Sequence, residues 1–175
     1  MTIPYYKLNI DFKLSDIVYT DRLYTYGKGY IQFYKIEDSI EKQLLSYLPV
    51  NSQKYFKGQL MIINGNTIKP HTDSDRLVAI NFYVKPNNAM TVFWEAKESL
   101  QNIDKVNGQT NGYVYNTQDL ILKHKFVAEP NSVYILDVSK IHSVYMTGKE
   151  ERLAFCLASN YYNYDQTIEL FEDRI

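Results

Sequence analysis

The sequence contains a single cysteine, Cys156, so no disulfide can form within the chain. It also has no apolar run near the roughly 20 residues that a membrane-spanning helix needs. The first residues, MTIPYYKLNIDFKL, lack the basic and then apolar segments of a secretory signal. These absences exclude a disulfide scaffold and argue against a helical membrane protein. We therefore expect a cytoplasmic protein of a reducing compartment.

The sequence also lacks an excess of charge of either sign. Lysine and arginine together number 19, aspartate and glutamate 20, and the net charge is −1. Proteins that bind nucleic acids or anionic membranes usually carry a basic surplus, so neither partner is expected. The 175 residues, of which 45% are hydrophobic, suffice for one domain, residues 1–175, with its own core. Nothing in the sequence specifies an oligomeric state.

Short apolar runs separated by turn residues occupy most of the chain, a pattern typical of mainly β proteins. One helix is predicted over residues 37–49, where apolar residues recur every four positions and Pro49 ends the pattern. A short helix is also expected in the tail. Strands are predicted over residues 30–36, 58–63, 76–84, 90–96, 113–116, 120–128, 132–138, 142–146 and 152–159. This pattern favours a double-stranded β-helix, or jelly roll, with a flanking N-terminal helix.

One of the three histidines lies in the stretch KPHTDSDRL, residues 69–77. His71 and Asp73 are two positions apart, so in an extended segment both point to the same side and can bind one divalent metal ion. His142, at the start of a later predicted strand, would complete the two-histidine, one-carboxylate set associated with non-haem Fe(II). The alternative is a polar turn in which Asp73 bonds to backbone amides. His124 has no such neighbour and is predicted to be structural.

Arg152 follows His142 with a turn around residue 147 between them. If the flanking segments form a hairpin, the two residues are directly opposed and share a face of the sheet. The guanidinium would then face the metal pocket, where it is suited to bind a carboxylate. The alternative is an exposed charge at a strand end. Asp75 and Arg76 are expected in a solvated turn at the pocket rim, with a contact to a polar substrate as the alternative.

Three segments carry a family resemblance: PHTDSDRLVAINFYV, MTVFW and PNSVYILDVSKIHSVYMTGKEERLAFCLA. Together they resemble the core of the Fe(II)/2-oxoglutarate-dependent dioxygenases, most strongly the prolyl-hydroxylase-like branch, over residues 59–159. The resemblance implies that His71, Asp73 and His142 bind Fe(II). It further implies that Arg152 binds the distal carboxylate of 2-oxoglutarate.

The same resemblance implies a further polar residue, on the strand after the His-x-Asp motif, that hydrogen-bonds 2-oxoglutarate. Asn81 and Tyr83 are the candidates, and the alternative for each is ordinary strand filling. Members of the family consume 2-oxoglutarate and O2, release succinate and CO2, and most often hydroxylate their substrate. We expect a small molecule, a free amino acid or a peptide side chain as the substrate. The alternative is a non-catalytic jelly-roll binding or structural module with a vestigial metal site.

Overall fold

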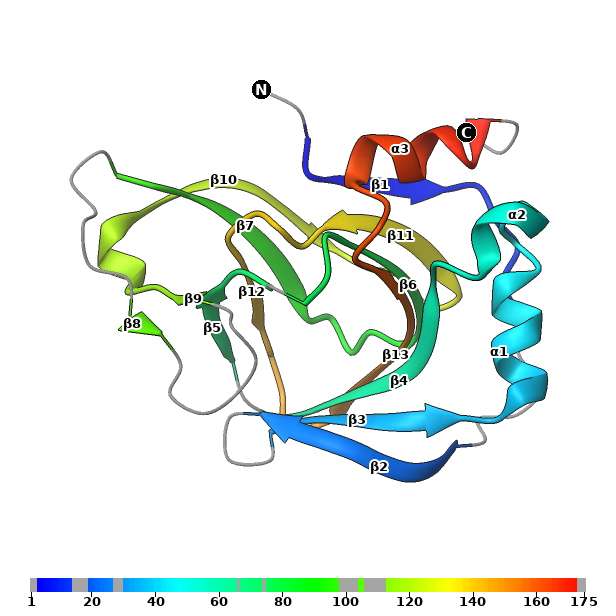
Figure 1. Ribbon diagram of the computed structural model, residues 1–175. Coiled ribbons are helices and arrows are strands. Elements are labelled where there is room, and N and C mark those ends of the chain that lie inside the picture. The colour runs from blue at the N-terminus through cyan, green and yellow to red at the C-terminus, as the bar shows by residue number, and fades with distance from the viewer. Residues whose placement is uncertain are drawn as a thin grey trace.

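The computed structural model describes residues 3–13, 19–26, 30–65, 67–73, 75–97, 104–105 and 113–172. These residues form two antiparallel sheets with short helices along the larger one (Figure 1). The larger sheet has the strand order β1 (Tyr5–Leu8), β11 (Ser132–Asp137), β6 (Val78–Lys85), β13 (Glu151–Ser159), β4 (Lys57–Asn64), β3 (Ile31–Ile36) and β2 (Tyr19–Tyr26). The smaller sheet has the order β10 (Leu120–Val127), β7 (Met90–Ala96), β12 (His142–Tyr145), β5 (Ile68–His71), β9 (Tyr113–Val114) and β8 (Asp104–Lys105).

Along the chain, successive core strands change sheet at each connection except that from β7 to β10, which pair within the smaller sheet. Strands β4, β6, β11 and β13 belong to the larger sheet, and β5, β7, β10 and β12 to the smaller one. The chain therefore crosses from sheet to sheet at both ends of the strands, which is the winding of a double-stranded β-helix. The crossing from β6 to β7 turns at Asn87 and Asn88, whose φ angles of 50° and 54° are left-handed values that asparagine tolerates. The predicted jelly roll is confirmed.

Helix α1 (Asp38–Leu45) packs on β4 at the outer face of the larger sheet. The apolar face predicted for this helix is confirmed, because all of its members are buried: Ile36, Ile40, Leu44 and Leu48. Helix and strand approach closely at Gly58, where an added Cβ would lie 3.0 Å from Glu41 Cγ of α1 and 2.7 Å from Ile36 Cδ1 at the end of β3. The Gly58 amide donates a 2.7 Å hydrogen bond to the Glu41 carboxylate. Gly58 therefore fixes how near α1 can lie to the sheet.

The predicted helix ends earlier than expected, at Leu45, and Pro49 instead precedes the one-turn helix α2 (Val50–Gln53). The short helix expected in the tail is present as α3 (Tyr164–Glu169), which begins with a capping box and packs on β11. A single 3-10 turn, Thr117–Asp119, precedes β10. Among the described residues, no helix has the length and apolar character needed to cross a bilayer.

Every strand predicted from the sequence is present, and four further strands, β1, β2, β5 and β8, lie outside the predicted ones. Strand β2, with the sequence YTDRLYTY, forms the far edge of its sheet and has no regular alternation of apolar and polar residues. Strand β5 is only four residues long and contains Pro70, a residue that argues against strands. The polar sequence of residues 97–112, with two Asn-Gly pairs, predicts a loop or hairpin insertion; of this segment the structure describes only Lys97 and β8.

The inner face of the larger sheet carries polar and small side chains that look toward the smaller sheet. Alternate residues of a strand share a face, which on β13 brings together Arg152, Ala154 and Cys156. Strand β6 lies beside β13, with Tyr83 paired to Ala154 and Asn81 to Cys156. All five of these residues are buried. Because Ala154 and Cys156 are small, the longer side chains beside them can lie between the two sheets.

Candidate metal centre

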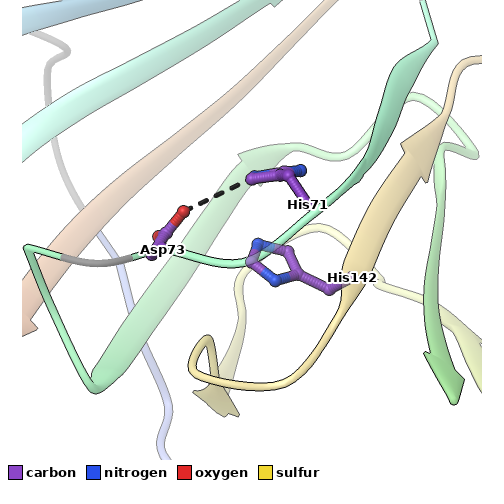
Figure 2. A group of neighbouring side chains, drawn as sticks. All are labelled: His71, Asp73 and His142. Carbon is purple, nitrogen blue, oxygen red and sulfur yellow. Dashed lines mark ion pairs between the residues drawn. The ribbon is translucent and has the colours of Figure 1, made fainter. Parts of the chain in front are cut away.

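Three side chains meet where the chain crosses between the sheets (Figure 2). His71 ends β5, Asp73 follows in the connection to β6, and His142 begins β12 directly after the connection from β11. One ligand atom from each lies within 4.8 Å of the others. Strand pairing sets His71 opposite His142. A 3.0 Å hydrogen bond from the Asp73 amide to the Val138 carbonyl joins the two connections, so backbone contacts position all three residues.

Backbone carbonyls orient both imidazole rings in the same way. His71 Nδ1 lies 2.9 Å from the carbonyl oxygen of Lys69, and His142 Nδ1 lies 3.0 Å from that of Lys140. A carbonyl oxygen can only accept, so each Nδ1 carries the proton and each neutral ring keeps its lone pair on Nε2. This is the arrangement that metal-binding histidines usually show. His71 Nε2 lies 3.5 Å from Asp73 Oδ1, the ion pair drawn in Figure 2.

The charges of the three side chains depend on one another. Burial disfavours protonation of His71, but the hydrogen bond with Asp73 and the charge of that carboxylate raise the pKa of His71 above its ordinary value. Burial likewise opposes ionisation of Asp73, yet the hydrogen bond from His71 and the charges of both imidazoles lower its pKa to about 2. Burial and the charge of His71 lower the pKa of His142 to about 4. At neutral pH the group therefore contains a carboxylate and a neutral His142.

The structure corrects the hairpin that was expected to oppose His142 and Arg152. Strand β12 pairs with β5 and β7, whereas β13 pairs with β4 and β6, so the two residues belong to different sheets. The turn after Tyr145 carries the chain from one sheet to the other instead of folding it back on itself. Arg152 nevertheless faces the smaller sheet, because its Nη2 donates a 3.0 Å hydrogen bond to Thr91 of β7.

The Arg152 guanidinium is only 1% exposed, and its hydrogen bonds with the described residues are incomplete. Nη2 donates to Tyr83 Oη at 2.9 Å and to Thr91 Oγ1 at 3.0 Å. Nε and Nη1 are buried, and among the described residues they have no partner and no ion pair includes Arg152. Arg152 is thus not the exposed strand-end charge that was the alternative. It is a buried cation with unused donors.

Asn81 and Tyr83 lie beside Arg152, and the three residues with Thr91 form a polar cluster between the sheets. Asn81 Nδ2 donates to Tyr83 Oη at 3.3 Å, and Asn81 Oδ1 is buried with no partner in the described part of the chain. The Arg152 guanidinium lies over the Tyr83 ring, 4.9 Å from its centroid. The local sequence does not mark Thr91, because threonine is common in strands. Thr91 contacts Arg152 only because the fold stacks β7 and β13 in opposite sheets.

Cys156 and Arg76 are two further buried residues near the metal group. Cys156 is buried, and burial raises the pKa of its thiol to about 11, so it is an inert thiol rather than a nucleophile. Arg76 was expected in a solvated turn but is only 8% exposed, which corrects that expectation. Its guanidinium contacts Asp73 and Asp75. Ser74, between these two aspartates, lies outside the described residues.

No protein-family model and no curated protein matches the chain. Vicilin from Solanum melongena is 13% identical, with a TM-score of 0.42, over 77% of this chain and 30% of its own. SnoN, a non-heme alpha-ketoglutarate-dependent epimerase from nogalamycin biosynthesis, is 11% identical, with a TM-score of 0.49, over 79% of this chain and 66% of its own. Oxalate decarboxylase from Bacillus subtilis is 12% identical, with a TM-score of 0.40, over 82% of this chain and 28% of its own.

The chain spans 66% or less of each of these proteins. Likenesses at these identities and TM-scores carry no argument about this chain, and jelly rolls have many unrelated functions. The function of this chain therefore has to be argued from its own side chains.

Proposed function

We propose that the chain is an Fe(II)- and 2-oxoglutarate-dependent oxygenase of the prolyl-hydroxylase-like branch that hydroxylates a small molecule, an amino acid or a peptide side chain. The observation that carries the proposal is the buried Arg152 guanidinium with unpaired donors, in the same inter-sheet region as a group of two histidines and an aspartate. The group alone is consistent with many metal sites. The unpaired cation specifies an anionic organic co-substrate.

The residues of the metal centre fit Fe(II). Two imidazole Nε2 atoms and one carboxylate are the ligand set that leaves open positions on non-haem iron. The backbone carbonyls of Lys69 and Lys140 hold the Nδ1 protons, so His71 and His142 would each present Nε2 without rearrangement. The low pKa of Asp73 keeps its carboxylate ionised and ready to bind a cation.

The polar cluster around Arg152 fits a carboxylate. The Tyr83 hydroxyl already accepts hydrogen bonds from Arg152 and Asn81, so both of its lone pairs are used and its own proton is left to donate. Nε and Nη1 of Arg152 are buried donors that have no acceptor among the described residues. A buried cation with unpaired donors is costly unless an anion binds there, and a carboxylate supplies the missing acceptors.

Strand geometry supports a short dicarboxylic acid between the two groups. On β7, Phe93 pairs with His142, and Thr91, which contacts Arg152, lies two residues further along the same face. Two residues of a strand span about 6.6 Å. A molecule that reaches from the metal ligands to the guanidinium therefore needs a backbone of only a few carbon atoms, as 2-oxoglutarate has.

Fe(II) held by His71, Asp73 and His142 would supply the oxygen chemistry of the reaction. In that reaction 2-oxoglutarate and O2 give succinate and CO2, and one oxygen atom is transferred to the substrate. The chain itself would orient the ligands, hold the distal carboxylate and exclude water from the inner face of the larger sheet. The same centre also suits other oxidative outcomes, and product analysis separates these from hydroxylation.

Succinate release tests the proposal. The protein is incubated with Fe(II), 2-oxoglutarate and O2, with a panel of free amino acids and short peptides, and products are sought by mass spectrometry as substrates that gain one oxygen atom. We expect succinate from the wild-type protein, none from His142→Ala, and wild-type rates from the matched control His124→Gln, which alters the histidine outside the metal group. A wild-type protein that binds neither metal nor 2-oxoglutarate would support the non-catalytic module instead.

A further inference from the structure

Arg76 lies just beyond the proposed metal ligands and contacts several groups around them. Its Nε and Nη2 donate to the two carboxylate oxygens of Asp75 at 3.1 and 3.0 Å, which makes a bidentate pair. Nη2 also donates to Tyr24 Oη at 3.1 Å. Nε lies 3.6 Å from Asp73 Oδ2. A side chain that is 10% exposed and has this many contacts is held in one place.

The two oxygens of the Asp73 carboxylate face different partners. Oδ1 lies 3.5 Å from His71 Nε2, on the side of the metal group, and Oδ2 lies 3.6 Å from Arg76. The cation therefore attracts one oxygen and leaves the other directed at the histidines. A carboxylate held in this way would bind a metal ion through one oxygen and keep the remaining positions open.

Elements outside the metal-binding segment fix Arg76 in turn. Its guanidinium lies 5.7 Å from the centroid of the Phe33 ring on β3. Tyr24 on β2, which accepts from Arg76, donates a 2.9 Å hydrogen bond to Gln59 on β4. The edge of the larger sheet formed by β2, β3 and β4 thus reaches the connection that carries Asp73.

We propose that Arg76 is a positioning residue that holds the Asp73 carboxylate in its metal-binding orientation, and that Tyr24 anchors Arg76 from β2. This inference rests on the proposed metal centre. The charge of Arg76 is balanced by Asp75, so the pair acts by orientation and adds no net charge beside the metal. In other metalloproteins, removal of a group that orients a metal ligand typically weakens metal binding by roughly 10- to 100-fold.

The test replaces the ion pair as a unit, so that the local net charge stays the same. The dissociation constant for Mn(II), a non-oxidising substitute for Fe(II), is measured by electron paramagnetic resonance of the free ion for the wild-type protein, Asp75→Asn, and the double variant Asp75→Asn with Arg76→Gln. Visible absorption of the Co(II)-loaded proteins reports the geometry of the ligands. Tyr24→Phe, which removes the hydroxyl that lies between Arg76 and Gln59, is the second probe. Thermal unfolding of each metal-free protein monitors folding.

We expect the double variant to bind Mn(II) about 10- to 100-fold more weakly and to shift the Co(II) absorption. Tyr24→Phe, and Asp75→Asn alone, should weaken binding in the same direction but by less. Equal dissociation constants and unchanged Co(II) spectra in Tyr24→Phe and in the folded double variant would overturn the positioning role while leaving the proposed function intact. A wild-type protein without Mn(II) affinity would overturn both.

Discussion

Replacing Arg152 with methionine is expected to weaken 2-oxoglutarate binding strongly without destabilising the ligand-free protein. The guanidinium is buried, makes two hydrogen bonds through Nη2, and leaves Nε and Nη1 unpaired. A residue that is buried for stability normally has all its donors paired. Arg152 instead keeps donors that only a bound anion could satisfy. Its replacement should therefore change binding and stability in opposite directions.

The magnitude follows from these contacts. Two charge-assisted hydrogen bonds from Nε and Nη1 to a bound carboxylate would contribute about 3 kcal/mol at the lower end of their range, so the variant should bind 2-oxoglutarate on the order of 100-fold more weakly. In the ligand-free protein, the two bonds lost from Nη2 are offset by removal of two unpaired donors, each costing about 1 to 3 kcal/mol. Removing a buried, unpaired charge adds to the gain. The free energy of unfolding should stay constant or rise by up to about 2 kcal/mol.

Thermal and urea unfolding measure both effects in one series, with Mn(II) present and with 2-oxoglutarate absent or added. At 100 times its dissociation constant, 2-oxoglutarate should stabilise the wild-type protein by about 2.7 kcal/mol, and this increment should be nearly lost in the variant. A ligand-free variant that is several kcal/mol less stable would show that Arg152 is a structural residue. An unchanged increment with 2-oxoglutarate would refute its role in binding.

The remaining predictions concern protonation, the polar cluster and the fold. The pKa of His71 is raised, and metal binding must displace its proton. The Mn(II) dissociation constant should therefore increase about tenfold for each pH unit below that pKa. Because histidine ordinarily titrates at about pH 6.5, a dissociation constant that is the same at about pH 6 and about pH 5 would contradict this. Tyr83→Phe should weaken 2-oxoglutarate binding about tenfold, and calorimetry should find no such loss in the nearby control Tyr134→Phe. Gly58→Ala should lower the free energy of unfolding by about 1 to 3 kcal/mol through overpacking against α1. Gly148→Ala should leave the free energy of unfolding unchanged, because a Cβ added there meets nothing closer than 4.0 Å. Equal urea midpoints for the two variants would contradict the close packing at Gly58.

Most of the strands could be predicted because burial leaves a clear pattern in the sequence. Strand β6 is buried on both faces, in one hydrophobic cluster on the outer side and a second one between the sheets. Residues 78–84 form an apolar run broken only by Asn81. Strand β2 is different, since it forms a sheet edge and shows no such run. Its contribution, the contact from Tyr24 to Arg76, depends on chain pairing that the local sequence does not encode.

The candidate site was predictable to the extent that it depends on local spacing. His71 and Asp73 share a side because they are two residues apart, and His142 was recognisable at a strand start. Arg152 was placed near the site through a hairpin that does not exist. Its side chain instead extends from the larger sheet to Thr91 on the smaller sheet. Such contacts between sheets follow from the winding of the whole fold, so spacing along the chain could not reveal them.

Calorimetric titration of 2-oxoglutarate into the wild-type protein, with and without Mn(II), tests the central claim most directly, because it needs no knowledge of the substrate. The proposed site predicts binding that requires the metal, with one 2-oxoglutarate per chain, and that is lost in both His142→Ala and Arg152→Met. Binding that is independent of the metal, or that persists unchanged in both variants, would contradict it.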